Sequence, residues 1–348
     1  MRAAGHLPGV HGQHLHRRQL RHVSSVTGHC HRHAHRPSGR CRSGEERMSL
    51  ARPLALLLAV ACSRPGWSAD VFQETLRSMR QLDAEITEPS RKAPLLEKAL
   101  ASLAPATSTG LGALSDDHVR DVYDAARMTA YYGYGVSAAA QMRRAWDELD
   151  RRHIAPAGSA DEVIETYLAA RLFDEAQAFQ RAHPAAVRVP PPAFTDLRRR
   201  TREPTVLAVV DDGSRLQRRP FSPTDKTRVV IVGSPWCQFS NAAAAEIESD
   251  PALKSLLGQH ATWLIPQQIV HDVRAVARWN HDHPANAMSL IYRQSEWPFI
   301  HTTATPTFYF FRDGTLVSSF SGWPGAAQKK VLSDNLRGIG LSAEDAAP

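Results

Sequence analysis

The side chain with the clearest chemical potential lies where an apolar run ends. The β-branched run 229–232 is followed by Pro235, Trp236 and Cys237, and then by an alanine-rich stretch that is predicted to be a helix. A cysteine in the first turn of a helix has a lowered pKa, because unpaired backbone N–H groups and the helix dipole favour the thiolate. The thiolate is the form that attacks a disulfide. Cys237 is therefore the first candidate for a catalytic residue.

The residue three positions after Cys237 is Ser240. A hydroxyl is not a competent nucleophile at neutral pH, so Ser240 cannot release a partner that Cys237 has captured as a mixed disulfide. The role that remains open to Ser240 is to donate a hydrogen bond to the Cys237 thiolate. Disulfide reduction through an internal disulfide is excluded for a chain with this pair.

A second motif precedes another apolar strand. Thr305, Pro306 and Thr307 lead into the run 307–311, and Asp313-Gly314 predicts a hairpin with 316–320, because such a turn favours glycine. Together with Pro-Trp-Cys-x-x-Ser, this order of elements resembles the thioredoxin-like superfamily over roughly residues 205–340.

The resemblance implies a set of site residues. Pro306 is expected to be cis and to lie beside Cys237, with the backbone of Thr305 able to pair with an extended peptide. Trp236 is expected to pack beside the cysteine. In two-cysteine relatives an acid before the first cysteine assists the second thiol, and that position here is Ile231. The resemblance therefore implies either monothiol exchange that uses an outside thiol or no redox chemistry.

Other sites are weaker alternatives. Cys-Gln-Phe-Ser is similar to the Cys-Gly-Phe-Ser of monothiol glutaredoxins, which hold iron–sulfur clusters, but Gln238 replaces the glycine. His281 and His283 lack a third metal ligand nearby in sequence and favour a helix end. His301 precedes the Pro306 loop and is interpreted as a loop residue rather than a base. We expect no metal and, for the redox interpretation, no cofactor.

The fold class expected is an α/β thioredoxin-like C-terminal domain, with a central mixed sheet flanked by helices. An all-α domain of helical hairpins precedes it in the chain. Residues 205–343 are expected to form the thioredoxin-like domain, with an inserted segment between about 270 and 300. Residues 70–187 are expected to form the all-α domain. Residues 188–204 are expected to form a Pro-rich linker, because Pro190, Pro191 and Pro192 forbid helix.

Helical spacing of apolar residues marks the all-α domain. Its later helices are predicted at 117–130, 137–152, 160–170 and 173–182. Two similar segments, Tyr123–Arg127 and Tyr167–Arg171, make it resemble a degenerate tetratricopeptide repeat, which implies stacked antiparallel helices and a surface that can bind a protein partner.

The basic charge of the chain belongs to its first residues. Residues 1–47 carry nine arginines and two glutamates, and the remaining residues carry 42 − 9 = 33 basic and 35 − 2 = 33 acidic groups. A nucleic-acid partner is therefore not expected. Residues 1–47 are predicted to be disordered or to precede the true start.

Met48 begins a stretch with the form of a signal peptide. A short basic segment, an apolar run at 53–61 and small residues before Ala69 predict cleavage near Ala69, and the run is too short to span a bilayer. We expect a periplasmic or secreted protein that keeps Cys237 as its one cysteine. Membrane attachment is expected only if Cys62 is lipidated.

Three interpretations follow. Cys237 performs monothiol exchange on protein or peptide thiols and disulfides with an external reducing thiol, or the domain is a catalytically degenerate binding module with a partner on its helical domain. The third, a cytoplasmic cofactor carrier, requires that synthesis does not start at Met48.

Overall fold

The computed structural model describes residues 70–198, 203–221, 228–267, 272–301 and 304–342. The leader at 1–47, the predicted signal peptide at 48–69 and the lipidation candidate Cys62 lie outside the described residues. All described residues belong to one compact unit, Ser63–Pro348.

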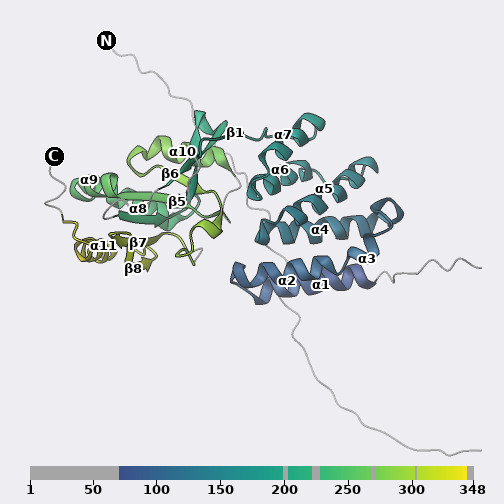
Figure 1. The fold of residues 1–348 in the computed structure, drawn as a ribbon, viewed down its shortest axis with the longest axis horizontal. Helices are drawn as coiled ribbons and strands as arrows, with labels where there is room; N and C mark the ends of the chain where they lie inside the picture. The colour runs from purple at the N-terminus through teal and green to yellow at the C-terminus, as the bar shows by residue number, and fades with distance from the viewer. Residues whose placement is uncertain (1–69, 199–202, 222–227, 268–271, 302–303, 343–348) are drawn as a thin grey trace, which may run out of the picture. The chain divides into compact units, whose positions relative to one another are not determined.

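The first part of the described chain is helical, as predicted (Figure 1). Its amphipathic helices bury their apolar faces against one another, with Met79, Trp146 and Phe179 in the core. The helices are α1 Asp70–Glu85, α2 Pro89–Ala101, α3 Ala104–Thr107, α4 Asp116–Gly133, α5 Val136–Arg151, α6 Ser159–Ala169 and α7 Phe173–Ala182, with the 3-10 helix η1 Leu111–Ala113.

The second part holds a mixed sheet with the strand order β1-β3-β2-β6-β5-β4-β7-β8. Strands β4, β5 and β6 are parallel, whereas β7 runs antiparallel to β4, and β8 runs antiparallel to β7. The strands are β1 Ala193–Asp196, β2 Thr205–Val210, β3 Arg215–Pro220, β4 Arg228–Val232, β5 Ala261–Ile265, β6 Met288–Ile291, β7 Thr307–Arg312 and β8 Thr315–Ser321.

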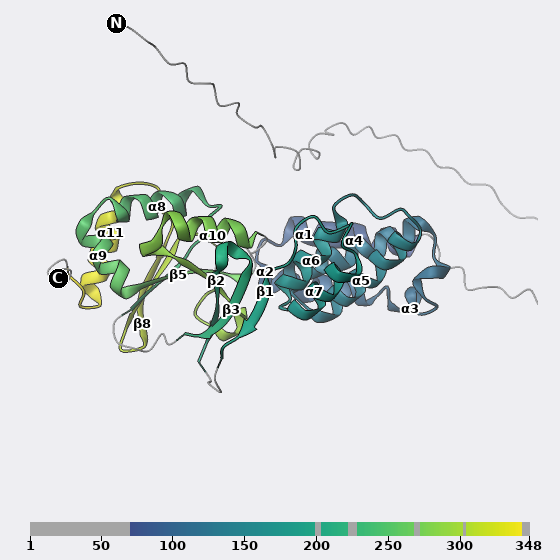
Figure 2. The ribbon, with the colours of Figure 1, turned by 90° about the horizontal axis from the view of Figure 1, so that it is seen from above.

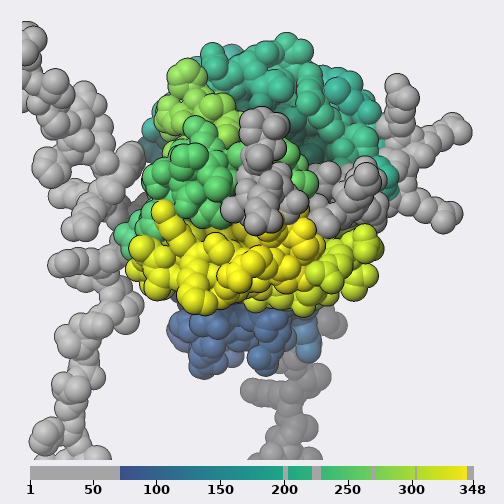
Figure 3. Space-filling model, turned by 90° about the vertical axis from the view of Figure 1, so that its left-hand side faces the viewer, coloured from purple at the N-terminus to yellow at the C-terminus, as the bar shows by residue number. Residues whose placement is uncertain are grey.

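Helices cover one face of this sheet. They are α8 Gln238–Glu248, α9 Pro251–His260, α10 Val273–Asp282 and α11 Ala327–Gly338, and short 3-10 helices occur at η2 Asp211–Gly213, η4 Pro284–Asn286 and η5 Gln294–Glu296. Figure 2 shows these α-helices on the same side of the strands. In the space-filling view of Figure 3, the C-terminal residues, in yellow, lie beside the green residues of α8 and α9.

The alternation of side chains along β4 explains the two faces. Val229 and Ile231 belong to the core under the helices, whereas Val230 and Val232 belong to a second apolar cluster on the opposite face. That second cluster is covered by Trp297, Phe299 and Ile300 from the segment after η5, with Trp297 fully buried, and not by α-helices. The mixed sheet was predicted, and its coverage by helices on one face only was not.

Two segments outside the predicted strands also join the sheet. Residues 193–196, expected to be part of a linker, form β1 and pair parallel with β3. The inserted segment expected between 270 and 300 supplies α10 and β6, and β6 pairs with β5 and β2. The polyproline stretch prevents helix but leaves the residues after it free to pair with an open strand.

A buried arginine links the helical part to the sheet part. Nε and a terminal nitrogen of Arg171 donate to the carbonyl oxygens of Tyr292 at 2.7 Å and Ile291 at 2.6 Å. Gln267 donates to the carbonyl oxygen of Ala169 at 2.8 Å. Within the described residues, every helix is too short or too polar to cross a membrane.

Candidate active site around Cys237

The loop after β4 places Cys237 at the start of α8. Gly233 follows the strand, and a Cβ atom there would lie 2.8 Å from the ring of Trp263, so the backbone approaches this ring more closely than another residue would allow. The loop then turns at Ser234, whose carbonyl oxygen accepts the N–H of Cys237 at 3.1 Å. Cys237 is the N-cap of α8. The predicted position at the beginning of a helix is thus the one observed.

The Pro306 loop lies against the sulfur of Cys237. Sγ is 3.1 Å from the carbonyl oxygen of Thr305, and the Thr305–Pro306 peptide bond is cis. The N–H of Gly322 donates to the carbonyl oxygen of Pro306 at 2.7 Å, and the Thr307 hydroxyl donates to that of Ala304 at 2.7 Å. These contacts hold the loop at the beginning of α8.

The environment of Cys237 lowers the pKa of its thiol. Burial by itself acts to raise this pKa, but hydrogen bonds from the Thr305 hydroxyl, the backbone N–H groups of Ser240 and Phe239, and the Ser240 hydroxyl outweigh it. In the protonated form the thiol donates to the Thr305 carbonyl oxygen, and in the thiolate form the sulfur accepts from the surrounding donors. Cys237 is only partly buried.

Ser240 lies beneath the cysteine. Its side chain is fully buried, and its hydroxyl oxygen accepts the N–H of Ser234 at 3.3 Å. The same hydroxyl is one of the donors that lower the Cys237 pKa. This arrangement fits the role that the sequence left open to Ser240.

Two aromatic side chains next to Cys237 are open to solvent. Trp236 is 45% exposed, and Phe239, in the first turn of α8, is 44% exposed. Trp236 was expected to pack beside the cysteine, and the exposed part of its ring remains available for contact with a ligand. Phe239 was not predicted to be a site residue. The sequence feature that could have indicated an exposed Phe239 is an aromatic residue at the beginning of a helix, followed by small residues.

The histidine candidates lie elsewhere. His283 contacts the carboxylate of Glu248 at 3.0 Å, which makes it part of the α8 to η4 packing. His301 is exposed, and no hydrogen bond between the described residues joins it to Cys237. Among these residues, no group of histidine, cysteine or acidic side chains could hold a metal ion.

The C-terminal part of the chain has a thioredoxin-like fold. Strands β6-β5-β4-β7-β8 form its central sheet, the helix after β4 begins at Cys237, and the loop before β7 brings a cis proline to the sulfur. Ile231, which stands where two-cysteine relatives have an acid, lies in β4, and its side chain is fully buried.

Comparisons with known proteins give only distant matches. No family profile and no curated protein matches the chain. It is similar to a secreted Mycobacterium tuberculosis disulfide oxidoreductase homologous to E. coli DsbE, with 21% identity, 35% of this chain and 90% of the other covered, and a TM-score of 0.27.

Two further solved structures are similar at the same level. For MTB DsbF the identity is 16%, with 33% of this chain and 81% of the other covered and a TM-score of 0.24. For a thioredoxin-like protein from Bacteroides caccae the identity is 10%, with 70% of this chain and 83% of the other covered and a TM-score of 0.25. The fold class of this chain follows from its own strand order and loops, and the low TM-scores add nothing to it.

Proposed function

We propose that Cys237 carries out monothiol thiol–disulfide exchange. The observation that carries this proposal is a partly buried cysteine at the beginning of α8, whose sulfur lies 3.1 Å from the Thr305 carbonyl oxygen and has hydrogen-bond donors that lower its pKa. A larger thiolate fraction at neutral pH makes such a cysteine a better nucleophile than an ordinary surface thiol.

The reaction has two steps. The Cys237 thiolate attacks one sulfur of a substrate disulfide, so that a mixed disulfide forms and the other substrate sulfur leaves as a thiolate and takes up a proton. An external thiol, deprotonated, then attacks the substrate sulfur of the mixed disulfide. The Cys237 thiolate leaves, and the external thiol ends in a disulfide with the substrate. Ser240 has no part in the second step, because its hydroxyl cannot displace a thiolate.

The substrates proposed are protein or peptide thiols and disulfides. The backbone of Thr305, beside Pro306, would pair with an extended peptide, and the exposed rings of Trp236 and Phe239 would add apolar contact. The site of action proposed is the periplasm or the exterior of the cell, with synthesis from Met48 and cleavage near Ala69.

The test is capture of a mixed disulfide. The protein is mixed with a glutathionylated peptide, quenched with acid, and digested for mass spectrometry, which assigns each adduct to its own cysteine. We expect an adduct on Cys237 that disappears when glutathione is added, and none on Cys237→Ser. Loss of this adduct in the native protein, while urea-unfolded protein reacts, would refute the proposal.

A second candidate function is binding without redox chemistry. The exposure of Trp236 and Phe239 favours it, because a binding surface uses such aromatic side chains whether or not a thiol reacts. In this case the tetratricopeptide-like helical domain engages a protein partner beside the sheet part. The discriminating variant is Cys237→Ala, which would retain peptide binding under this second function and lose the exchange reaction under the first.

A further inference from the structure

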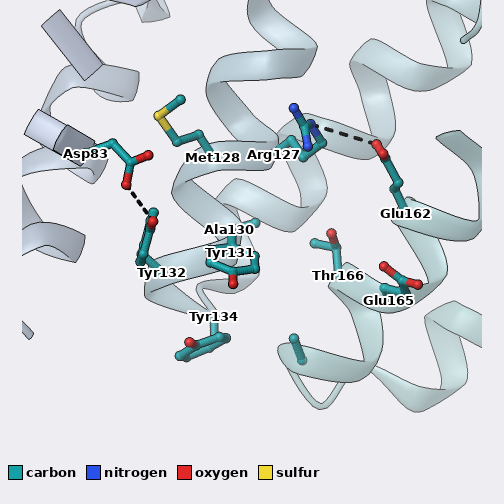
Figure 4. A pocket seen from close by; sticks show the side chains of 11 residues that line it. Asp83, Arg127, Met128, Ala130, Tyr131, Tyr132, Tyr134, Glu162, Glu165 and Thr166 are labelled. Atoms are coloured by element: carbon teal, nitrogen blue, oxygen red, sulfur yellow. Dashed lines mark hydrogen bonds and ion pairs between the residues drawn. The ribbon is translucent and has the colours of Figure 1, made fainter. Parts of the chain in front are cut away.

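A cavity of about 470 Å³ lies in the helical part of the chain, apart from Cys237. It is formed by the C-terminal end of α4 and by α6, with one residue from α1. Figure 4 shows tyrosines from the α4 end on one side and Glu162, Glu165 and Thr166 of α6 on the other. Its size is in the range of pockets that bind small organic groups.

Aromatic side chains form one wall. The sequence Tyr131-Tyr132-Gly133-Tyr134 ends α4, and all three tyrosines line the cavity. Tyr131 and Tyr132 pack edge to face with ring centroids 4.9 Å apart. Tyr131 is 49% exposed, so this wall is reached from solvent. The faces of such rings attract cations.

Two of the three acidic residues in the cavity have partners. Asp83 accepts hydrogen bonds from the ammonium group of Lys92 and the hydroxyl of Tyr132. Glu162 accepts from the hydroxyl of Tyr123 at 2.7 Å and is 3.8 Å from the guanidinium of Arg127. Each of these two carboxylates therefore has a basic side chain and a tyrosine hydroxyl of the protein as partners.

Arg127 is the one basic residue in the lining. Its guanidinium lies 3.8 Å from Glu162 and 3.7 Å from Asp124. Two carboxylates thus face one guanidinium, and the cavity has no surplus positive charge to bind an anion.

Glu165 differs from the other acids in the cavity. No hydrogen bond or ion pair reaches its carboxylate from the described residues. Burial raises the pKa of Glu165 to about 7, and the carboxylates of Glu162, Asp161 and Asp272 add to the rise, against a weaker opposite effect of Arg188. An unpaired carboxylate in these surroundings is destabilising when it is charged, and a cation would remove that penalty.

We propose that this cavity binds an alkylammonium or guanidinium group, with the charge on Glu165, the alkyl chain against Met128 and Thr166, and the exposed ring of Tyr131 beside it. Such a group could come from a free amine or from a lysine or arginine side chain of a protein. The site does not depend on Cys237 chemistry, so Cys237→Ala is expected to leave it unchanged.

The pH dependence of binding follows from Glu165. Below pH 7 the carboxylate takes up a proton, and a cation then competes with that proton for the site. Above pH 7 the carboxylate is charged and binds the cation without this competition. The affinity for a permanently charged cation should therefore rise as the pH increases through about 7.

The test uses titration calorimetry of the full chain with n-pentylamine, which remains protonated at both pH 5.5 and pH 8. We expect binding at pH 8 that is about tenfold or more weaker at pH 5.5, and about tenfold or more weaker in Glu165→Gln, since one charge-assisted contact is lost. The matched control is Glu175→Gln, an exposed acid on α7 outside the cavity, which should bind like the native chain.

Further probes separate the causes and sources. Neutral n-pentanol should not bind, and a capped peptide with one lysine should bind more tightly than n-pentylamine only if the natural cation belongs to a protein. Circular dichroism checks that Glu165→Gln is folded. Equal binding of n-pentanol and n-pentylamine, or equal binding by folded Glu165→Gln and native protein, would overturn the proposal.

Discussion

The thiol of Cys237 is subject to opposing effects whose balance decides its chemistry. Partial burial favours the neutral thiol, whereas hydroxyl and N–H donors at the beginning of α8 favour the thiolate and prevail. The donors come from two separate segments, α8 and the loop at Thr305. The reactivity of this cysteine therefore depends on the position of the Pro306 loop as well as on the helix itself.

The rate of alkylation of Cys237 should follow a titration with a midpoint below the value of about 8.5 for an ordinary cysteine. Ser240→Ala removes one donor to the thiolate, so its midpoint should move upward and its alkylation at pH 7 should slow. Iodoacetamide labelling against pH, followed at the Cys237 peptide by mass spectrometry, measures both. Unfolded protein in urea supplies the reference, and a native midpoint equal to that reference would contradict this prediction.

Ser240→Cys should convert the site into one with two sulfurs. Because Ser240 is fully buried beneath Cys237, the new thiol would lie where a mixed disulfide on Cys237 could be attacked from within. We expect an internal disulfide under mild oxidation and a gain in insulin reductase activity with dithiothreitol. Cys237→Ser in the same background should abolish both, and a variant that stays a dithiol would show that the site does not support this reaction.

The sequence located the main residues of the site but not their surroundings. Cys237, Ser240 and Pro306 could be found because their spacing and flanking strands resemble a known pattern. The hydroxyl of Thr305 could not be identified as a donor, because its approach to the sulfur depends on the path of a loop. The exposure of Trp236 and Phe239 could not be predicted for a similar reason, since sequence shows that a ring is large and not which way it faces.

The end of β4 is built around the contact between a glycine and a tryptophan. Gly233 lies where a Cβ atom would be 2.8 Å from the ring of Trp263, and this ring is buried in β5. The side chain of Trp263 also donates from its ring nitrogen to Asn286 at 3.2 Å, so it has little freedom to move away. The loop that leads to Cys237 therefore depends on a residue without a side chain.

Gly233→Ala should destabilise the protein by about 1–3 kcal/mol, because the new methyl group overpacks the Trp263 ring. Gly258→Ala is the matched control. Gly258 lies in α9 with no atom within 4 Å of a new Cβ, so the variant should be neutral or more stable by up to about 1 kcal/mol. Urea unfolding followed by circular dichroism measures both, and destabilisation of the two variants by equal amounts would contradict this explanation.

The strands that were predicted are those with clear apolar patterns. The runs at 229–232 and 307–311 are rich in β-branched and aromatic residues, and each is a strand. The strand β3 was missed, because Arg215–Pro220 is mostly polar. Its Arg218 is buried through contacts with Glu296 and the ring of Tyr292, which no local pattern reveals.

At the scale of the whole molecule, the helical part and the sheet part meet through Arg171. This side chain is buried, burial lowers its pKa to about 10, and it stays charged at neutral pH. Among the described residues it makes no ion pair, and its three hydrogen bonds go to the carbonyl oxygens of Leu168, Ile291 and Tyr292. Its backbone φ of 62° directs the chain out of α6.

Arg171→Met should weaken the link between the two parts. The substitution keeps an unbranched chain but leaves three buried carbonyl oxygens without this donor, which should destabilise the protein by about 2–4 kcal/mol. We expect calorimetric unfolding to change from one transition to two. Arg181→Met, at an exposed position on α7, is the control. A single transition at the native temperature in Arg171→Met would show that other contacts hold the parts together.

The attachment of Arg171 has a consequence for how this chain can vary. Its guanidinium holds main-chain oxygens of residues 291 and 292, and those atoms are the same whatever amino acids stand there. Related sequences could therefore exchange the residues of this sheet end, as their own packing allows, while the arginine stays. Arg171 is therefore the position to compare among related sequences. Its acceptors at 291 and 292 are main-chain oxygens, which any amino acid at those positions provides.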